Sequence, residues 1–92
     1  MQVRATLIVN GTVRTAECRE DIHRQATRLG LTGLFEELGD GNTRIVVEGE
    51  KERVNEFIAS FNEGRRLAHF SGFDIEFRNP EGCFGSFIVA GT

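Results

Sequence analysis

The sequence predicts an α+β sandwich, in which two helices cover one face of an antiparallel sheet. Several short segments alternate apolar and polar residues, as strands with one buried face do. Two longer segments repeat their apolar residues at helical spacing. The pair Asp40-Gly41 joins two of the strand-like segments, as the turn of a β-hairpin does. Together these features predict the element order β-α-β-β-α-β.

The first predicted strand and the first predicted helix lie on either side of a short loop. Residues 3–9 alternate as a strand, and Asn10-Gly11 breaks the alternation. A helix is expected over residues 15–29 or 19–29, and Gly30 is placed to stop it. The residues that share its apolar face are Ile22, Ala26 and Leu29.

A hairpin and a second helix are predicted next. Residues 31–38 and 43–48 are expected to be strands, joined by a turn at residues 39–42. Residues 50–62 show the most regular helical spacing in the chain, and Gly64 is placed to end the helix. The apolar residues that define this helix are Val54, Phe57, Ile58 and Phe61.

The last part of the chain predicts two more strands. Residues 68–78 alternate apolar and charged residues, residues 79–82 form a turn around a proline, and residues 84–90 form a short last strand. Two helices on one face of an antiparallel sheet in this order make a ferredoxin-like sandwich. We therefore expect one domain over residues 1–92, with the short last strand added to that sandwich.

The composition argues against several classes of protein. The chain has 11 basic and 14 acidic residues, and a net charge of −3 does not favour binding to nucleic acid. No apolar run approaches the roughly 18 residues of a membrane span, and no secretory leader is recognisable. Cys18 and Cys83 are too few for a disulfide framework or a zinc site. His23 and His69 have no metal-spaced partner, so surface or packing roles are expected. From these features we expect a cytoplasmic protein.

The loop after the first strand is the candidate functional site. A loop that opens into a helix can bind phosphate, because the first backbone N–H groups of a helix have no partner within it. The candidate anion-binding residues are Val13, Arg14, Thr15, Ala16, Glu17, Cys18 and Arg19. The two arginines would attract an anion, whereas the glutamate would repel it.

Several short motifs resemble the acylphosphatase family. They are residues 9–13 (VNGTV), Arg19, residues 28–33 (RLGLTG), Asp40-Gly41 and residues 46–49 (VVEG), and their spacing fits the family pattern without a gap. Members of this family are small enzymes of the ferredoxin-like fold that hydrolyse the carboxyl–phosphate bond of acyl phosphates without a cofactor. The resemblance covers nearly the whole chain, and it implies a small anionic ligand, either an acyl phosphate or phosphate.

The resemblance also implies roles for individual residues. In the family, backbone N–H groups of the first loop and a signature arginine bind the phosphate, and Arg19 stands at that arginine position. An asparagine on the second strand positions the attacking water, and the matching residue here is Glu37. Two glycines of the family loop are replaced by Thr15 and Glu17. We therefore expect hydrolysis that is weak or lost; the alternative is a non-catalytic ligand- or protein-binding module on the same fold.

The charged residues of this region each have two interpretations. Glu17 either stabilises the start of the helix through the helix dipole or pairs with Arg19 in the place of phosphate. Glu37 is either a polar strand residue beside Glu36 or a base that accepts a proton from water. Arg19 either faces the loop or is solvated, and Arg14 is expected to be solvated.

Two further motifs have structural explanations that we prefer. Cys18 lies next to Arg19 near a helix start, where thiolates are activated, but cysteine phosphatases separate these two residues by a five-residue loop. A buried structural cysteine is therefore favoured. Residues 82–89 (GCFGSFIV) are similar to the aromatic RNA-binding motif of RRM domains. The motif lies on the last strand and follows an acidic residue, so a core or edge strand is favoured.

Overall fold

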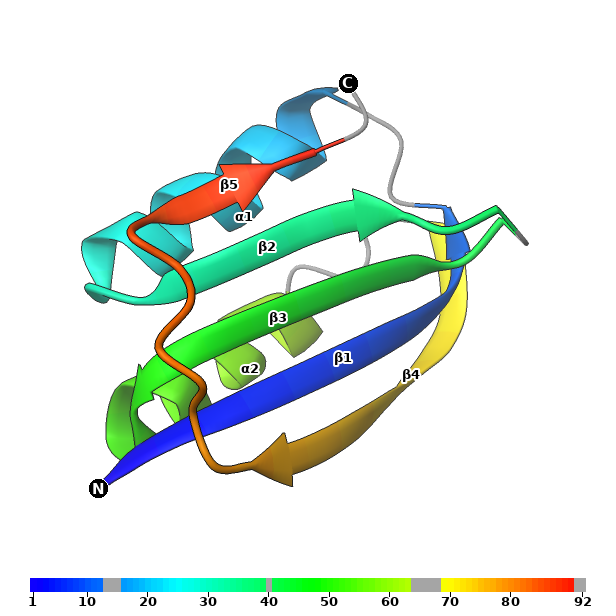
Figure 1. Cartoon of the computed structure of the whole chain (residues 1–92). Coiled ribbons are helices and arrows are strands. Elements are labelled where there is room, and N and C mark those ends of the chain that lie inside the picture. Colours follow the sequence, from blue (N-terminus) through cyan, green and yellow to red (C-terminus); the bar gives the residue numbers. More distant parts are fainter. Residues whose placement is uncertain (13–15, 40, 64–68, 91–92) are drawn as a thin grey trace.

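The computed structural model describes residues 1–12, 16–39, 41–63 and 69–90. Five strands and two helices follow one another in this part of the chain (Figure 1). They are β1 (Gln2–Thr12), α1 (Ala16–Arg28), β2 (Thr32–Glu37), β3 (Thr43–Glu50), α2 (Lys51–Glu63), β4 (His69–Arg78) and β5 (Phe87–Val89). The predicted order β-α-β-β-α-β with a short last strand is confirmed.

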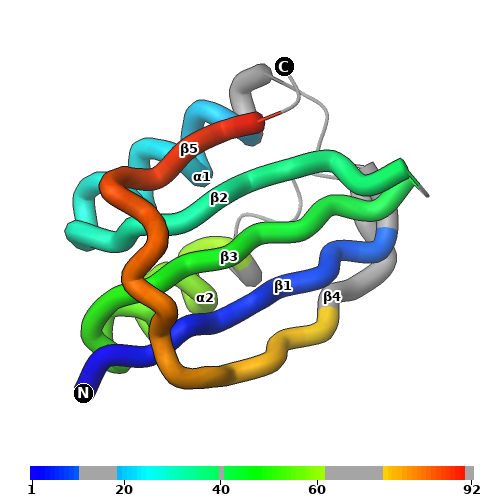
Figure 2. The backbone as a smooth tube through the Cα atoms, viewed as in Figure 1, coloured from blue at the N-terminus to red at the C-terminus, as the bar shows by residue number. Residues whose placement is uncertain are grey.

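The strands form one sheet in the order β4-β1-β3-β2-β5. The first four strands are antiparallel to their neighbours, whereas β5 runs parallel to β2. Figure 1 shows both helices on one face of this sheet, as the ferredoxin-like prediction requires. The tube in Figure 2 follows the chain from β4 at one edge, across the helix-free face, to β5 at the opposite edge.

The last strand is shorter than the sequence predicts. Residues 84–90 were expected to be extended, but only Phe87–Val89 pair with β2. The preceding residues 79–85 carry the chain from β4 across the sheet, so their backbone is not available for pairing along β2. Two hydrogen bonds bracket the short ladder: Gly33 N donates to Ser86 O at 3.1 Å, and Ala90 N donates to Phe35 O at 2.7 Å.

The crossing segment is fixed to the open face of the sheet by a buried carboxylate. Glu48 of β3 is only 5% exposed, and its two oxygens accept the backbone N–H groups of Glu81 and Gly82 at 2.9 and 3.1 Å. Arg4 of β1 lies beside it, with Nε 3.0 Å from Glu48 Oε2 and Nη1 3.1 Å from Glu81 Oε1. The Arg4 guanidinium also lies over the ring of Phe84. This cluster holds the crossing segment so that β5 reaches the edge of β2.

The core lies between the helices and the sheet. The inward-facing residues of β1, β2 and β3 are buried, apart from the partly buried Val3, and so are three of the four apolar residues that define the second helix; the fourth, Ile58, is partly buried. This set comprises Ala5, Leu7, Val9, Phe35, Ile45, Val47, Val54, Phe57 and Phe61. Ile22 and Ala26 of α1 and Leu29 just after it belong to the same cluster, as their spacing predicts, and Leu31 and Phe87 complete it.

The residues after α1 and in the hairpin behave as the sequence indicates, whereas the turn predicted at residues 79–82 is wrong, because these residues belong to the segment that crosses the sheet. Gly30 has a φ of +69°, and Leu31 N donates to Ala26 O at 2.9 Å, which ends α1 in the usual glycine-capped way. In the hairpin turn, Leu38 N donates to Asn42 O at 2.7 Å, and Gly41 N donates to Leu38 O at 3.1 Å. Both ends of β2 are therefore defined, and this fixes where its last residue, Glu37, lies.

Candidate functional site

The candidate site lies where β1 and β2 end and α1 begins. Arg19 is in the first turns of α1, and Glu37 is the last residue of β2. Arg19 Nη1 lies 3.6 Å from Glu37 Oε1, although the two residues are far apart in the sequence. The side chains are 23% and 34% exposed, so the pair is open to solvent on one side. Arg19 therefore faces this end of the sheet.

The strands and helix orient both side chains toward each other. Phe35 is fully buried on the helix face of β2, and Glu37, two residues later, points to the same face. Glu37 lies opposite Thr43 of β3, and Thr43 lies opposite Val9 of β1. Thr43 is only 1% exposed and Val9 is 0% exposed, so these side chains close the site to solvent on the side of the sheet. The neighbouring Glu36 points to the open face and pairs with Arg44.

Part of the predicted loop lies outside the described residues. This applies to Val13, Arg14 and Thr15, and also to the side chains of Ala16, Glu17 and Cys18. The backbone of Glu17 belongs to the first turn of α1, where a carboxylate is favourable against the helix dipole. The predictions that Thr15 caps the helix, that Cys18 is buried and that Glu17 pairs with Arg19 remain predictions. The partner that the structure gives Arg19 is Glu37.

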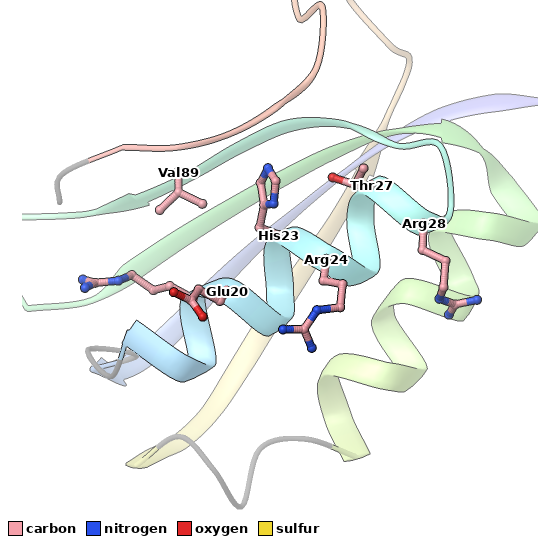
Figure 3. Close-up of a pocket in the computed structure, with 7 residues that line it drawn as sticks. Glu20, His23, Arg24, Thr27, Arg28 and Val89 are labelled. Carbon is pink, nitrogen blue, oxygen red and sulfur yellow. The ribbon is translucent and has the colours of Figure 1, made fainter.

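A shallow groove that the sequence did not predict continues from Arg19 along α1. Its lining residues come from α1 and β5 (Figure 3); they are Arg19, Glu20, His23, Arg24, Thr27, Arg28 and Val89. Figure 3 shows His23 and Thr27 pointing toward β5, and Arg24 and Arg28 pointing to the other side of the helix. The spacing of four residues from Arg19 to His23 and Thr27 is the signal that could have predicted this lining.

The remaining candidate residues lie away from Arg19. The ring of His23 packs against Phe87 at 6.1 Å, which confirms a packing role. Cys83 is an exposed free thiol in the crossing segment, 3.9 Å from Arg4 Nη2, at the other end of the sheet. The side chain of His69 lies outside the described residues. Phe87, which belongs to the RNA-binding-like motif, is 4% exposed, so it offers no stacking surface for a base.

The part of the chain that the structure describes contains neither a cluster of metal-ligating side chains nor a helix that could span a membrane. Among residues 1–12, 16–39, 41–63 and 69–90, no group of three or more histidine, cysteine, aspartate and glutamate side chains could hold a metal ion. In the same residues no helix is long and apolar enough to cross a membrane.

Comparison with known proteins decides the family. The family model of acylphosphatases matches residues 5–89. The chain belongs to the acylphosphatase family. It is 34% identical to an acylphosphatase of Thermococcus kodakarensis over 88 residues, covering 96% of this chain and 97% of that protein. It is 41% identical to an acylphosphatase of Caldivirga maquilingensis over 75 residues, covering 80% and 79%.

A solved structure shows the same fold. The crystal structure of acylphosphatase from Bacillus subtilis superimposes with a TM-score of 0.84 at 18% sequence identity, covering 97% of this chain and 99% of that chain. Membership of the acylphosphatase family supports an acylphosphatase-like function for this chain. Arg19 and Glu37, the two residues for which the resemblance predicts roles in phosphate binding and water positioning, lie in contact in the structure.

Proposed function

We propose that this chain hydrolyses small acyl phosphates weakly, without a cofactor, at the site around Arg19. The observation that supports the proposal is the contact between Arg19 and Glu37, 3.6 Å apart. Arg19 stands at the arginine position of the family's phosphate site, and its side chain is 23% exposed, so a phosphate has access to the guanidinium. The carboxylate beside it opposes that binding, because it already neutralises the guanidinium and repels an incoming anion.

The chemistry that this site can support is a transfer of the phosphoryl group to water. Water attacks phosphorus, the bond from phosphorus to the carboxyl oxygen breaks, and the acyl group leaves as a carboxylate. A carboxylate is a weak base, so its departure needs no proton from the protein. What the protein must supply is positive charge at the phosphoryl oxygens and orientation of the water.

Arg19 can supply that charge, whereas Glu37 is a poor water-positioning group. A guanidinium presents planar donors that match phosphate oxygens, and it stays charged at all physiological pH values. An ionised glutamate accepts hydrogen bonds but donates none, so it can orient a water molecule only through the water's own protons. Glu37 would lie next to the phosphate that it repels. Both effects predict slow turnover.

Hydrolysis of benzoyl phosphate tests the proposal. We expect a rate above the spontaneous one that disappears in Arg19→Gln, and a rate well below that of the Thermococcus kodakarensis acylphosphatase assayed beside it. The double variant Glu17→Gly with Glu37→Asn should gain activity, because it removes both opposing charges. A wild-type rate equal to that of the Thermococcus enzyme would contradict weak activity.

The same experiment addresses the non-catalytic alternative. If wild type and the double variant both stay at the spontaneous rate while inorganic phosphate still shifts the amide signals of residues 13–19, the chain is an anion-binding module. If phosphate causes no shifts either, the site does not bind small anions and the proposal fails. The control is Glu36→Gln, because Glu36 has the same charge but lies on the opposite face of β2 beside Arg44.

A further inference from the structure

The long edge strand of the sheet is a surface that the proposed site does not use. β4 is paired with β1 on one side and forms the edge of the sheet on the other. An edge strand presents backbone N–H and C=O groups that can pair with another strand. The opposite edge, β5, has only three residues, whereas β4 has ten. β4 is therefore the better template for an added strand.

Within residues 74–78, the part of β4 whose side chains the structure describes, the helix-side face carries two exposed apolar side chains, which we call the β4 strip: Ile75 and Phe77. Their neighbours on β1 are Leu7 and Ala5, which are both 0% exposed. Ile75 and Phe77 themselves are 38% and 49% exposed. Large apolar side chains on a regular strand beside the core are normally covered, so the β4 strip needs an explanation.

The arrangement of the helices explains why the β4 strip is uncovered. α2 packs mainly against β3 and β1, and α1 packs against β5. Figure 1 shows the two helices behind these strands, with β4 at the far edge. The addition of β5 makes the sheet five strands wide, and two helices about 10 Å across cover about four strands spaced 4.8 Å apart. The uncovered strand is β4.

The opposite face of the same strand carries charges of both signs. Asp74, Glu76 and Arg78 are exposed and alternate with the residues of the β4 strip. Arg78 Nη2 lies 2.5 Å from Glu76 Oε1 in the same chain. A strand with mixed charges can match a second copy of itself, because antiparallel pairing places different residues of the two copies opposite each other.

We propose that β4 pairs antiparallel with β4 of a second copy of the chain, with Glu76 opposite the partner's Glu76. In this register Ile75 lies opposite the partner's Phe77 and Asp74 lies opposite the partner's Arg78, and each of these contacts occurs twice. The two β4 strips then cover each other on the helix side. Two opposite-charge pairs outweigh the single like-charge pair at the centre, and each Glu76 is already paired with its own Arg78.

The neighbouring two-fold registers are less favourable. A two-fold axis perpendicular to the sheet places one residue of β4 opposite the same residue of the partner. The possible registers therefore differ in which residue lies at this centre. With Ile75 at the centre, Asp74 would face the partner's Glu76 twice, which creates two like-charge pairs. With Phe77 at the centre, only residues 76–78 of the strand would overlap. Like charges thus disfavour the first of these registers and short overlap disfavours the second, which leaves the register centred on Glu76 as the most favourable of the three.

The dimer is expected to be weak. The paired segments contain five residues each, residues 74–78, whereas a stable interface uses roughly 20–30 residues on each side. A dissociation constant on the order of 100 µM is expected for an edge contact of this size. The equilibrium is therefore visible only at high protein concentration.

Sedimentation equilibrium from about 10 µM to about 1 mM protein tests the proposal. The average mass of wild type should rise toward that of two copies. Phe77→Lys should weaken association at least tenfold, since it places a cation in the strip of each copy. Ile88→Lys is the matched control, because Ile88 is 48% exposed on β5 at the other edge and should leave association unchanged. A wild-type monomer at about 1 mM, or an equal effect of both variants, would overturn the proposal.

Charge reversal tests the register without changing the apolar strip. Asp74→Arg should weaken association, because it places two arginines opposite each other. The double variant Asp74→Arg with Arg78→Asp should restore it, because the pair is re-formed with reversed signs. Failure of the double variant to recover association would overturn the register centred on Glu76. Far-ultraviolet circular dichroism of each variant confirms that it remains folded.

Discussion

Replacement of Glu37 by glutamine is expected to tighten the binding of inorganic phosphate about five- to thirtyfold. In the wild type, Glu37 Oε1 lies 3.6 Å from Arg19 Nη1, so a phosphate on this guanidinium would approach a carboxylate. Glutamine keeps the size of the side chain and removes its charge. It can also donate a hydrogen bond to the bound anion, which an ionised glutamate cannot do.

The magnitude follows from the distance and the exposure of the pair. Two unit charges about 5 Å apart repel each other by about 3 kcal/mol at an effective dielectric constant of 20, and by about 1 kcal/mol in bulk water. Arg19 and Glu37 are 23% and 34% exposed, so solvent screens the interaction and the lower part of this range applies. A change of about 1–2 kcal/mol corresponds to about five- to thirtyfold in the dissociation constant.

The assay is a phosphate titration followed by the backbone amide signals of residues 13–19. Ionic strength must be constant, because added phosphate salt also screens the charges. Glu36→Gln is the control: it removes a carboxylate one residue away whose partner is Arg44 on the open face. Equal phosphate affinity in wild type, Glu37→Gln and Glu36→Gln would refute the electrostatic reasoning. Weaker binding in Glu37→Gln would mean that Glu37 positions Arg19 rather than competing for it.

Three further predictions concern the fold. Glu48→Ala should lower the free energy of unfolding in urea by about 3–5 kcal/mol, because it leaves two backbone N–H groups and the Nε of Arg4 without the buried carboxylate. Glu36→Ala, whose partner Arg44 lies on the open face, should lower it by less than about 1 kcal/mol. Gly33→Ala should destabilise the domain far more than Gly30→Ala, since a Cβ at Gly33 would lie 1.8 Å from Val46 O, whereas one at Gly30 meets nothing within 4 Å; equal melting temperatures would contradict this. The N-terminal ammonium donates a hydrogen bond to Glu50 and lowers the pKa of that carboxyl below its ordinary 4.5. The ionised Glu50 therefore contributes to stability above pH 4.5, and this contribution is lost as the pH falls through the lowered pKa. Acetylation of the N-terminus should remove this part of the acid dependence of the melting temperature, and an unchanged curve would show that the contact contributes nothing.

The sequence alone predicted the elements whose signals are local. The second helix was found within one residue at each end, because Val54, Phe57 and Phe61 repeat at helical spacing and all three are buried in the core. The hairpin was found from Asp40-Gly41 in the same way. The resemblance to the acylphosphatases also aligned Arg19 and Glu37 with family positions, and these are the two side chains that the structure brings together.

Only the tertiary structure decided which elements cover one another. Alternation in β4 indicates that one face is apolar, but the strand order β4-β1-β3-β2-β5 places it beyond the reach of the helices, so Ile75 and Phe77 are exposed. The shortening of β5 has the same origin, since residues 79–85 must cross the sheet to reach β2. Likewise, the residues gave no sign that Arg19 would pair with Glu37. Periodicity records which side chains face away from water along one element, whereas contacts between elements depend on how the whole chain packs.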